Sequence, residues 1–197
     1  GEILARGRAI ETMFDSVDVL VGRLLGRQYV LTIGLATLFG ALSGTAMGVA
    51  AMLGRSVLPG MRERDYDLRL STGAIMAGAC LAPIIPPSVL VIIIGTLAGV
   101  SISGLMVAGI LPGLLLAAMF LLYILFRVRN DPALAPVEAK SNSEQAANAD
   151  VPIAVLRLLP VTLVILSIMG LIVLGIATPS EAAATGVLGA ALTVAFY

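Results

Sequence analysis

Two groups of residues could hold a small cation inside an otherwise apolar chain. The sequences Ser43-Gly44-Thr45 and Ile85-Pro86-Pro87-Ser88 each lie within a long uncharged stretch. Hydroxyl groups and main-chain carbonyls without a hydrogen-bond partner are hard oxygen ligands, and such ligands suit sodium. We therefore predict that the ion-binding residues are Ser43, Gly44, Thr45, Ile85, Pro86, Pro87 and Ser88.

The residue types that most often support catalysis are missing from this chain. It contains no histidine, and Cys80 is its single cysteine. This excludes disulfide frameworks, Cys/His metal sites and Ser-His or Cys-His catalysis within the sequence. We expect Cys80 to be a small apolar packing residue. The uncharged stretches also hold no acid or base for a proton relay, so ion-coupled transport follows better than enzymatic chemistry.

Composition assigns the chain to the membrane proteins. Apolar residues make up 59% and charged residues 12% of the sequence, against a norm of about a quarter charged in soluble domains. Mean hydropathy is +1.05. We predict an all-α polytopic membrane protein and expect this chain to be part of a longer one.

Residues 68–97 are predicted to form a broken transmembrane helix. Proline lacks an amide donor and clashes with the carbonyl four residues earlier, and Pro83, Pro86 and Pro87 fall within five positions. In lipid, irregular backbone survives only where protein buries it or where it lines a wet cavity. We therefore place a binding site at this break; the alternative is a proline kink that only shapes packing.

Residues 29–54 are predicted to form a re-entrant hairpin. This uncharged run could cross a hydrocarbon core of roughly 30 Å once at about 1.5 Å per residue. However, Gly40, Gly44 and Gly48 surround the two hydroxyl residues at its middle, and arginines flank both ends. Since basic flanks stay in the cytoplasm, the run must leave and return on one side. The alternative is a single span with a small-residue packing face.

The remaining segments complete a topology in which all 12 lysines and arginines are cytoplasmic. Residues 1–28 are predicted to form an amphipathic helix that lies in the interface or braces other helices, a soluble linker helix being the alternative. Residues 105–127 form a span, residues 130–156 a flexible cytoplasmic loop, and residues 157–197 two further spans. The last helix starts at Thr178-Pro179-Ser180-Glu181, which has the residues of a helix cap.

Several of these stretches, in this order, resemble one transporter family. They are Leu42-Ser43-Gly44-Thr45-Ala46, Arg64-Asp65-Tyr66-Asp67, Ile85-Pro86-Pro87-Ser88, Ala108-Gly109-Ile110-Leu111-Pro112-Gly113 and Ala177-Thr178-Pro179-Ser180-Glu181-Ala182-Ala183-Ala184. The chain resembles the large permease subunit of tripartite ATP-independent periplasmic (TRAP) transporters, the DctM-like family. The resemblance implies an inverted-repeat, elevator-type fold in the bacterial inner membrane. The chain would hold most of the first repeat and the opening of the second.

The resemblance also implies a function. The family takes up organic anions, mostly carboxylates, with a sodium gradient as the driving force. A periplasmic binding protein delivers the substrate, and a small membrane subunit braces the permease. Residues 43–45 and 85–88 would then form the family's first sodium site. Two departures from the family pattern, Ala82 in place of a usual glycine and the additional Pro83, could reshape the loop. We expect no cofactor beyond the coupling ion and no nucleic-acid partner.

Four other functions are compatible with the sequence. The nearest is a sodium/organic-acid symporter of related architecture that needs no binding protein. A channel built on re-entrant half-helices would conduct without regard to the sodium gradient. A membrane enzyme is disfavoured because no nucleophile-base pair or metal set is visible, and a scaffold subunit without transport activity is the fourth.

Overall fold

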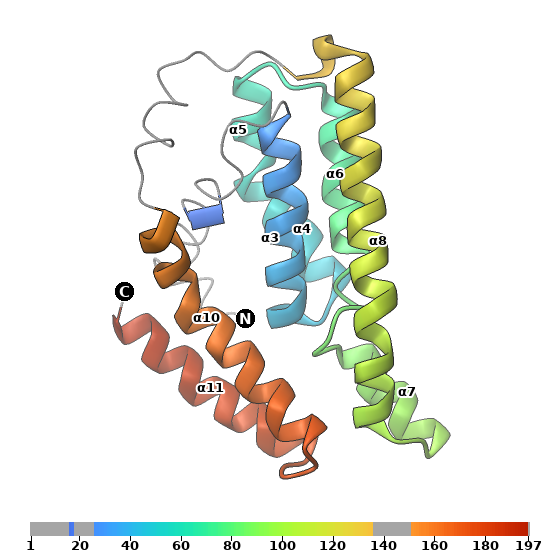
Figure 1. The fold of residues 1–197 in the computed structure, drawn as a ribbon, viewed down its shortest axis with the longest axis vertical. Coiled ribbons are helices and arrows are strands. Elements are labelled where there is room, and N and C mark those ends of the chain that lie inside the picture. The colour runs from blue at the N-terminus through green and yellow to red at the C-terminus, as the bar shows by residue number, and fades with distance from the viewer. Residues whose placement is uncertain (1–15, 18–25, 136–150, 197) are drawn as a thin grey trace.

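Helices make up all the regular structure in the part of the chain that the computed structural model describes, residues 16–17, 26–135 and 151–196 (Figure 1). In chain order the helices are α3 (Arg27–Ser43), α4 (Ala46–Ser56), α5 (Leu58–Glu63), α6 (Leu68–Ala79), α7 (Val89–Ala98), α8 (Ile102–Asn130), the 3-10 turn η1 (Pro132–Leu134), α10 (Val151–Val173) and α11 (Pro179–Phe196).

Helix α8 follows the long axis of the molecule, and Figure 1 shows it running most of the height, with α7 and the turn between α10 and α11 reaching below it. Its 29 residues correspond to about 44 Å, more than the roughly 30 Å of a bilayer core. Among the described residues it is the one helix both long and apolar enough to cross a membrane by itself. It begins at Ile102, three residues before the predicted start, because the Ser101 hydroxyl accepts a hydrogen bond from the Gly104 amide and caps the first turn.

The chain from α3 to α4 turns back within the height of α8. Helix α3 has 17 residues and packs against both α6 and α8. Helix α4 has only 11 residues, about 16 Å, so it is too short to cross a bilayer by itself. In Figure 1 the turn between them lies part-way along α8 rather than at its lower end. The two helices therefore form a hairpin and not a single continuous span.

Helices α6 and α7 are two short segments separated by an irregular stretch. Helix α6 has 12 residues and α7 has 10, and residues 80–88 join them. Figure 1 shows α6 beside the upper part of α8 and α7 beside its lower part. Neither segment is long enough to cross a bilayer core of roughly 30 Å alone.

Small residues let α6 and the stretch that follows it approach α3 closely. A β-carbon added at Gly78 would lie 2.5 Å from the Ala36 Cβ of α3, and one at Gly40 would lie 2.9 Å from the Ala82 Cα. Such contacts leave no room for a larger side chain at either glycine.

The prediction for Cys80 is wrong: its side chain is exposed and is not packed in the core. It follows Gly78 by two residues, and residues two apart point to different faces of a helical turn.

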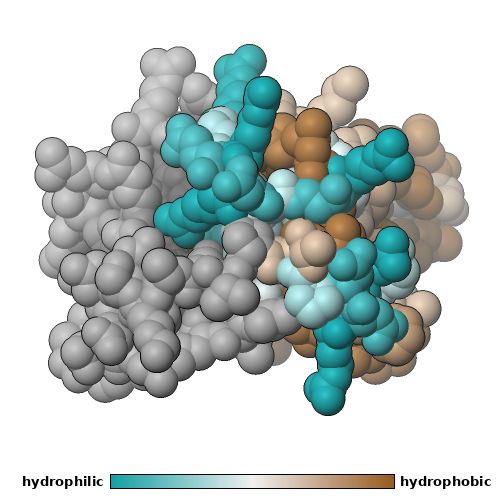
Figure 2. Space-filling view, turned by 90° about the horizontal axis from the view of Figure 1, so that it is seen from above, coloured by the Kyte–Doolittle hydropathy of each residue, from teal (hydrophilic) through white to brown (hydrophobic). Residues whose placement is uncertain are grey.

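Most of the charged residues that the structure describes gather at one end of the molecule. The starts of α3 and α6, the short helix α5 and the end of α8 meet at the top of Figure 1. Figure 2 looks down on this end and shows hydrophilic residues gathered there, with hydrophobic residues farther away. The arginines in or next to these helix ends are Arg27, Arg62, Arg64, Arg69, Arg127 and Arg129. The turn at the opposite end, residues 99–101, has no basic residue, which is the asymmetry that the positive-inside rule requires.

Helices α10 and α11 form a second, antiparallel pair that packs on α8 through α10 (Figure 1). Helix α10 starts at Val151, six residues before the predicted start of this region at residue 157, because the apolar residues after Asp150 join the helix. The Thr178 hydroxyl faces the Glu181 amide at 3.4 Å, and the Glu181 carboxylate accepts from the Thr178 amide at 2.8 Å. This reciprocal cap starts α11 where the sequence places it.

Two predicted segments fall largely outside the described residues. The predicted amphipathic segment 1–28 is described only at residues 16–17 and 26–28, where Val17 is buried and its Cγ1 lies near Gly34 of α3. Residues 136–150 of the predicted loop are likewise outside the described ranges.

Candidate functional site

The turn of the hairpin depends on one glycine. Gly44 ends α3 with φ 64° and ψ 8°, a left-handed conformation that costs other L-residues energy. Its amide donates to the Gly40 carbonyl at 2.7 Å, which closes the last turn of α3. Thr45 is then extended, and α4 starts at Ala46. The glycine thus reverses the chain within two residues.

Two hydroxyl groups lie side by side at this turn. The Ser43 Oγ and the Thr45 Oγ1 are 2.9 Å apart and form a hydrogen bond. Both oxygens lie over Gly48, where an added β-carbon would be 2.8 Å from each of them. Ser43 is half-buried and Thr45 is exposed, so the pair is accessible from one side. The structure therefore brings two of the predicted ligands together.

The loop between α6 and α7 is held by Ser88. This residue is completely buried, and its hydroxyl donates to the Pro83 carbonyl at 2.7 Å. The same oxygen faces the Val91 amide at 3.4 Å and caps α7. The peptide bond between Pro86 and Pro87 is cis. The hydroxyl of Ser88 is thus already engaged within the loop, and no hydrogen bond joins it to the hydroxyls of Ser43 or Thr45.

The hairpin turn and the broken-helix loop touch each other. A β-carbon added at Gly44 would lie 3.1 Å from the Val89 amide nitrogen and 3.3 Å from the Pro87 carbonyl oxygen. The Val89 Cγ2 would lie at the same distance of 3.1 Å from that β-carbon, so Gly44 packs against both the backbone and a side chain of this segment. Two interruptions about forty residues apart in the sequence therefore meet at one place in the fold.

Helix α8 supports the loop from the other side, through two glycines that the sequence analysis did not assign to the site. A β-carbon at Gly109 would lie 2.9 Å from the Ile84 carbonyl oxygen, and one at Gly113 would lie 2.8 Å from the Ile85 Cγ1. The sequence did contain a sign of a close packing face, because these two glycines are four residues apart and so share one face of a helix. The sequence did not show which segment that face contacts.

Comparison with known proteins identifies the family. Residues 1–197 match the family described as tripartite ATP-independent periplasmic transporter, DctM component. The chain belongs to the DctM family of TRAP permeases. The resemblance drawn from the Ile-Pro-Pro-Ser and Thr-Pro-Ser-Glu-Ala-Ala stretches is thereby confirmed.

Individual relatives agree with this membership. The ectoine TRAP transporter large permease protein TeaC of Halomonas elongata is 33% identical over 192 residues, which cover 97% of this chain and 43% of the relative. The C4-dicarboxylate TRAP transporter large permease protein DctM of Pseudomonas aeruginosa is 28% identical over 198 residues, or 100% of this chain and 44% of the relative. The sialic acid TRAP transporter permease protein SiaT of Haemophilus influenzae is 34% identical over 134 residues, or 67% and 22%.

This TRAP permease chain spans less than half the length of these relatives. Its relatives are transporter permeases and integral membrane proteins, in agreement with its apolar composition and its helical structure in the described ranges.

The two interruptions in this TRAP permease chain carry oxygen atoms that could coordinate a cation. Within the described residues, no group of three or more His, Cys, Asp or Glu side chains could hold a metal ion. The carbonyl of Pro87 receives no backbone hydrogen bond from these residues, and it faces Gly44. Neutral oxygens of this kind can replace the hydration shell of a monovalent cation.

Proposed function

We propose that this chain is part of a sodium-coupled secondary transporter for organic acids and that the coupling ion binds where the hairpin turn meets the broken helix. The observation that carries the proposal is the contact of Gly44 with the backbone of Pro87 and Val89. It places the Ser43–Thr45 hydroxyl pair and the carbonyls of the proline loop in neighbouring segments.

The proposed ion is sodium because the ligands are uncharged oxygens. A divalent cation is normally held by carboxylates, and residues 28–54 and 70–126 contain no Asp or Glu. Half-helix ends and unwound carbonyls are the usual sodium ligands in the middle of a membrane transporter. We propose that the Pro87 carbonyl and the Ser43 and Thr45 hydroxyls contact the ion and that Ser88 holds the loop in place.

The proposed substrates are organic acids delivered by a periplasmic binding protein. The names of the relatives specify ectoine, C4-dicarboxylates and sialic acid, all of which carry a carboxylate group. We extend this to the present chain, together with a small membrane subunit as partner and the bacterial inner membrane as location. Its exposed apolar residues on α7, α8 and α10 suit contact with lipid or with such a subunit. The proposed architecture is the inverted-repeat elevator, with α10 and α11 opening the second repeat.

Uptake into proteoliposomes tests the proposed function. The complete permease, with its small subunit and its cognate binding protein, is expected to accumulate a carboxylate when an inward sodium gradient is applied. Uptake should saturate with substrate and stop when potassium replaces sodium. Flux that ignores the sodium gradient would indicate the channel alternative, and full uptake without the binding protein would indicate an independent symporter.

Removal of a hydroxyl at each interruption tests the ion site. In the complete permease, Ser43→Ala is expected to raise the sodium concentration for half-maximal uptake severalfold, because it removes a proposed ligand. Ser88→Ala should have a similar effect through the loop, since loss of an N-cap costs about 1 kcal/mol. Both variants should insert into the membrane normally.

Two serines serve as matched controls for these substitutions. Ser56→Ala removes an exposed hydroxyl from α4, and Ser101→Ala removes the cap of α8 at the uncharged turn. Neither should change sodium activation. If Ser43→Ala and Ser88→Ala behave like their controls, the assignment of the ion site is wrong.

A further inference from the structure

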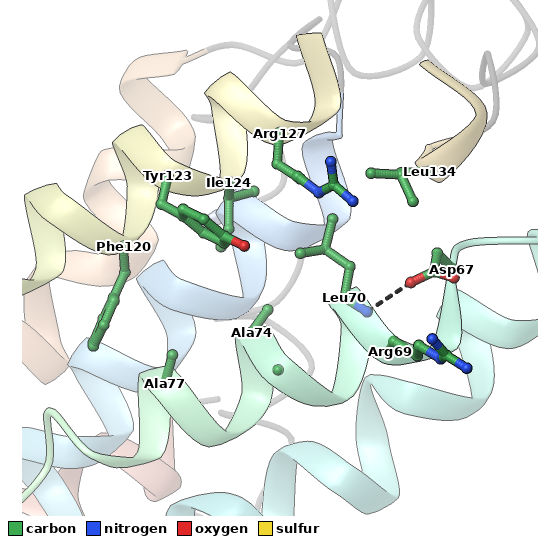
Figure 3. Close-up of a pocket in the computed structure, with 11 residues that line it drawn as sticks. Asp67, Arg69, Leu70, Ala74, Ala77, Phe120, Tyr123, Ile124, Arg127 and Leu134 are labelled. Atoms are coloured by element: carbon green, nitrogen blue, oxygen red, sulfur yellow. Dashed lines mark hydrogen bonds between the residues drawn. The ribbon is translucent and has the colours of Figure 1, made fainter. Parts of the chain in front are cut away.

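A groove between α6 and α8 lies at the charged end of the molecule, away from the proposed ion site. Its volume is about 630 Å³. Small residues of α6, Ala74 and Ala77, form one wall, and the aromatic residues Phe120 and Tyr123 of α8 form the other (Figure 3). Arg69 and Arg127 also line the groove. The groove is therefore apolar along its length and basic at one end.

The basic end carries an excess of positive charge. Arg69 and Arg127 are exposed, and within the described part of the chain neither guanidinium group forms an ion pair. Asp67, the single acid among the described residues that line the groove, accepts a hydrogen bond from the Leu70 amide at 2.8 Å and caps α6. Figure 3 shows the Arg127 side chain directed into the space between the two helices. Because the Asp67 carboxylate is already hydrogen-bonded, the guanidinium groups of Arg69 and Arg127 favour the binding of an anionic group at this end.

Hydrogen bonds hold the basic end in a defined shape. The Tyr29 hydroxyl donates to the Leu134 carbonyl at 2.6 Å, and the Asp67 amide donates to the same oxygen at 3.2 Å. The rings of Tyr29 and Tyr66 are also in edge contact, with centroids 5.1 Å apart. These contacts tie the segment that follows α8 to α3 and to the start of α6. The two arginines thus project from helices whose separation is fixed.

We propose that this groove binds one anionic phospholipid of the cytoplasmic leaflet. The phosphate lies between Arg69 and Arg127, and an acyl chain lies along the apolar wall from Ala74 toward Ala77 and Phe120. Charge complementarity supports this occupant, because two basic residues stand at one end of an apolar groove. The positive-inside rule puts such residues at the cytoplasmic face, where the headgroups of anionic lipids lie. A protein helix would fill the apolar part but would leave the two cations without a partner. This site goes beyond the proposed transport function and does not depend on it.

Lipid binding to the complete permease tests the site. The protein, freed of lipid in detergent, is titrated with phosphatidylglycerol or phosphatidylcholine and followed by native mass spectrometry and by the midpoint of thermal unfolding. Phosphatidylglycerol is expected to bind more tightly and to raise the midpoint. The double variant Arg69→Gln/Arg127→Gln should weaken its binding about 30-fold, because each basic residue near an anionic lipid contributes roughly fivefold.

Control variants make the result specific to the groove. Arg62→Gln/Arg129→Gln removes the same charge from exposed positions at the same end and should leave binding unchanged. Ala77→Phe fills the apolar path and should also weaken binding, with both arginines in place. An excess of inorganic phosphate should not displace the lipid. Equal binding of the two lipids, equal loss in the control pair, displacement by phosphate, or full binding to Ala77→Phe would each overturn the proposal.

Discussion

The Gly44→Ala variant of the complete permease is expected to lose at least about nine tenths of its sodium-driven uptake while inserting into the membrane normally. A left-handed conformation costs an L-residue about 1–2 kcal/mol, which corresponds to about tenfold in an equilibrium. In addition, the new methyl group would lie 3.1 Å from the Val89 amide nitrogen, a backbone atom that cannot move aside cheaply. The turn would therefore be pushed away from the loop, and the proposed ligands would separate.

Substitutions at two other glycines distinguish the cost of the left-handed backbone from the cost of the contact with Val89. Gly99 has a similar left-handed φ of 65° but no atom within 4 Å of an added β-carbon, so Gly99→Ala has the backbone cost without the contact. Gly54 lies within α4 in open space, and Gly54→Ala has neither cost. Uptake rates of the three variants, each corrected for the amount of protein in the membrane, provide the measurement. If Gly99→Ala impairs uptake as strongly as Gly44→Ala, the contact between the two interruptions is unimportant.

Gly109→Ala is expected to lower both uptake and the midpoint of thermal unfolding of the purified permease. The added methyl group would lie 2.9 Å from the Ile84 carbonyl oxygen, so α8 and the loop would have to move apart. Overpacking of this kind costs about 1–3 kcal/mol. Because the loop holds the proposed ion ligands, the change should also raise the sodium concentration needed for uptake.

The control for this variant lies in the same helix. An added β-carbon at Gly104 meets only the Ser101 side chain, at 3.5 Å, which is an ordinary contact. Gly104→Ala should therefore leave uptake and stability near those of the parent. Comparable behaviour of the two variants would mean that α8 does not support the loop.

Both experiments address one property of the fold, namely that glycine allows backbone to touch backbone at the candidate site. Gly44 touches the loop from the hairpin side, and Gly109 touches it from α8. The loop is therefore enclosed by two elements that follow its shape closely. Such support matters for a site built on carbonyl oxygens, since these ligands move with the main chain.

The sequence alone determined where the helices are interrupted. Gly44 ends α3 because its backbone tolerates a positive φ, and the prolines after Ala82 prevent α6 from continuing because they lack amide donors. The motifs around these interruptions were also sufficient to name the family. These are properties of each residue and its immediate neighbours, so they can be read without knowing how the helices pack.

Only the tertiary structure decided which segments meet. It placed Gly44 against Pro87, seated the loop on Gly109, and turned the Ser88 hydroxyl toward the Pro83 carbonyl. It also left Cys80 exposed, although the sequence analysis expected a small apolar packing residue there. The contacts of Gly44 and Gly109 with the loop depend on the rotation of one helix relative to another that is distant in sequence. That rotation follows from the summed packing of many side chains, and local propensity holds no information about it.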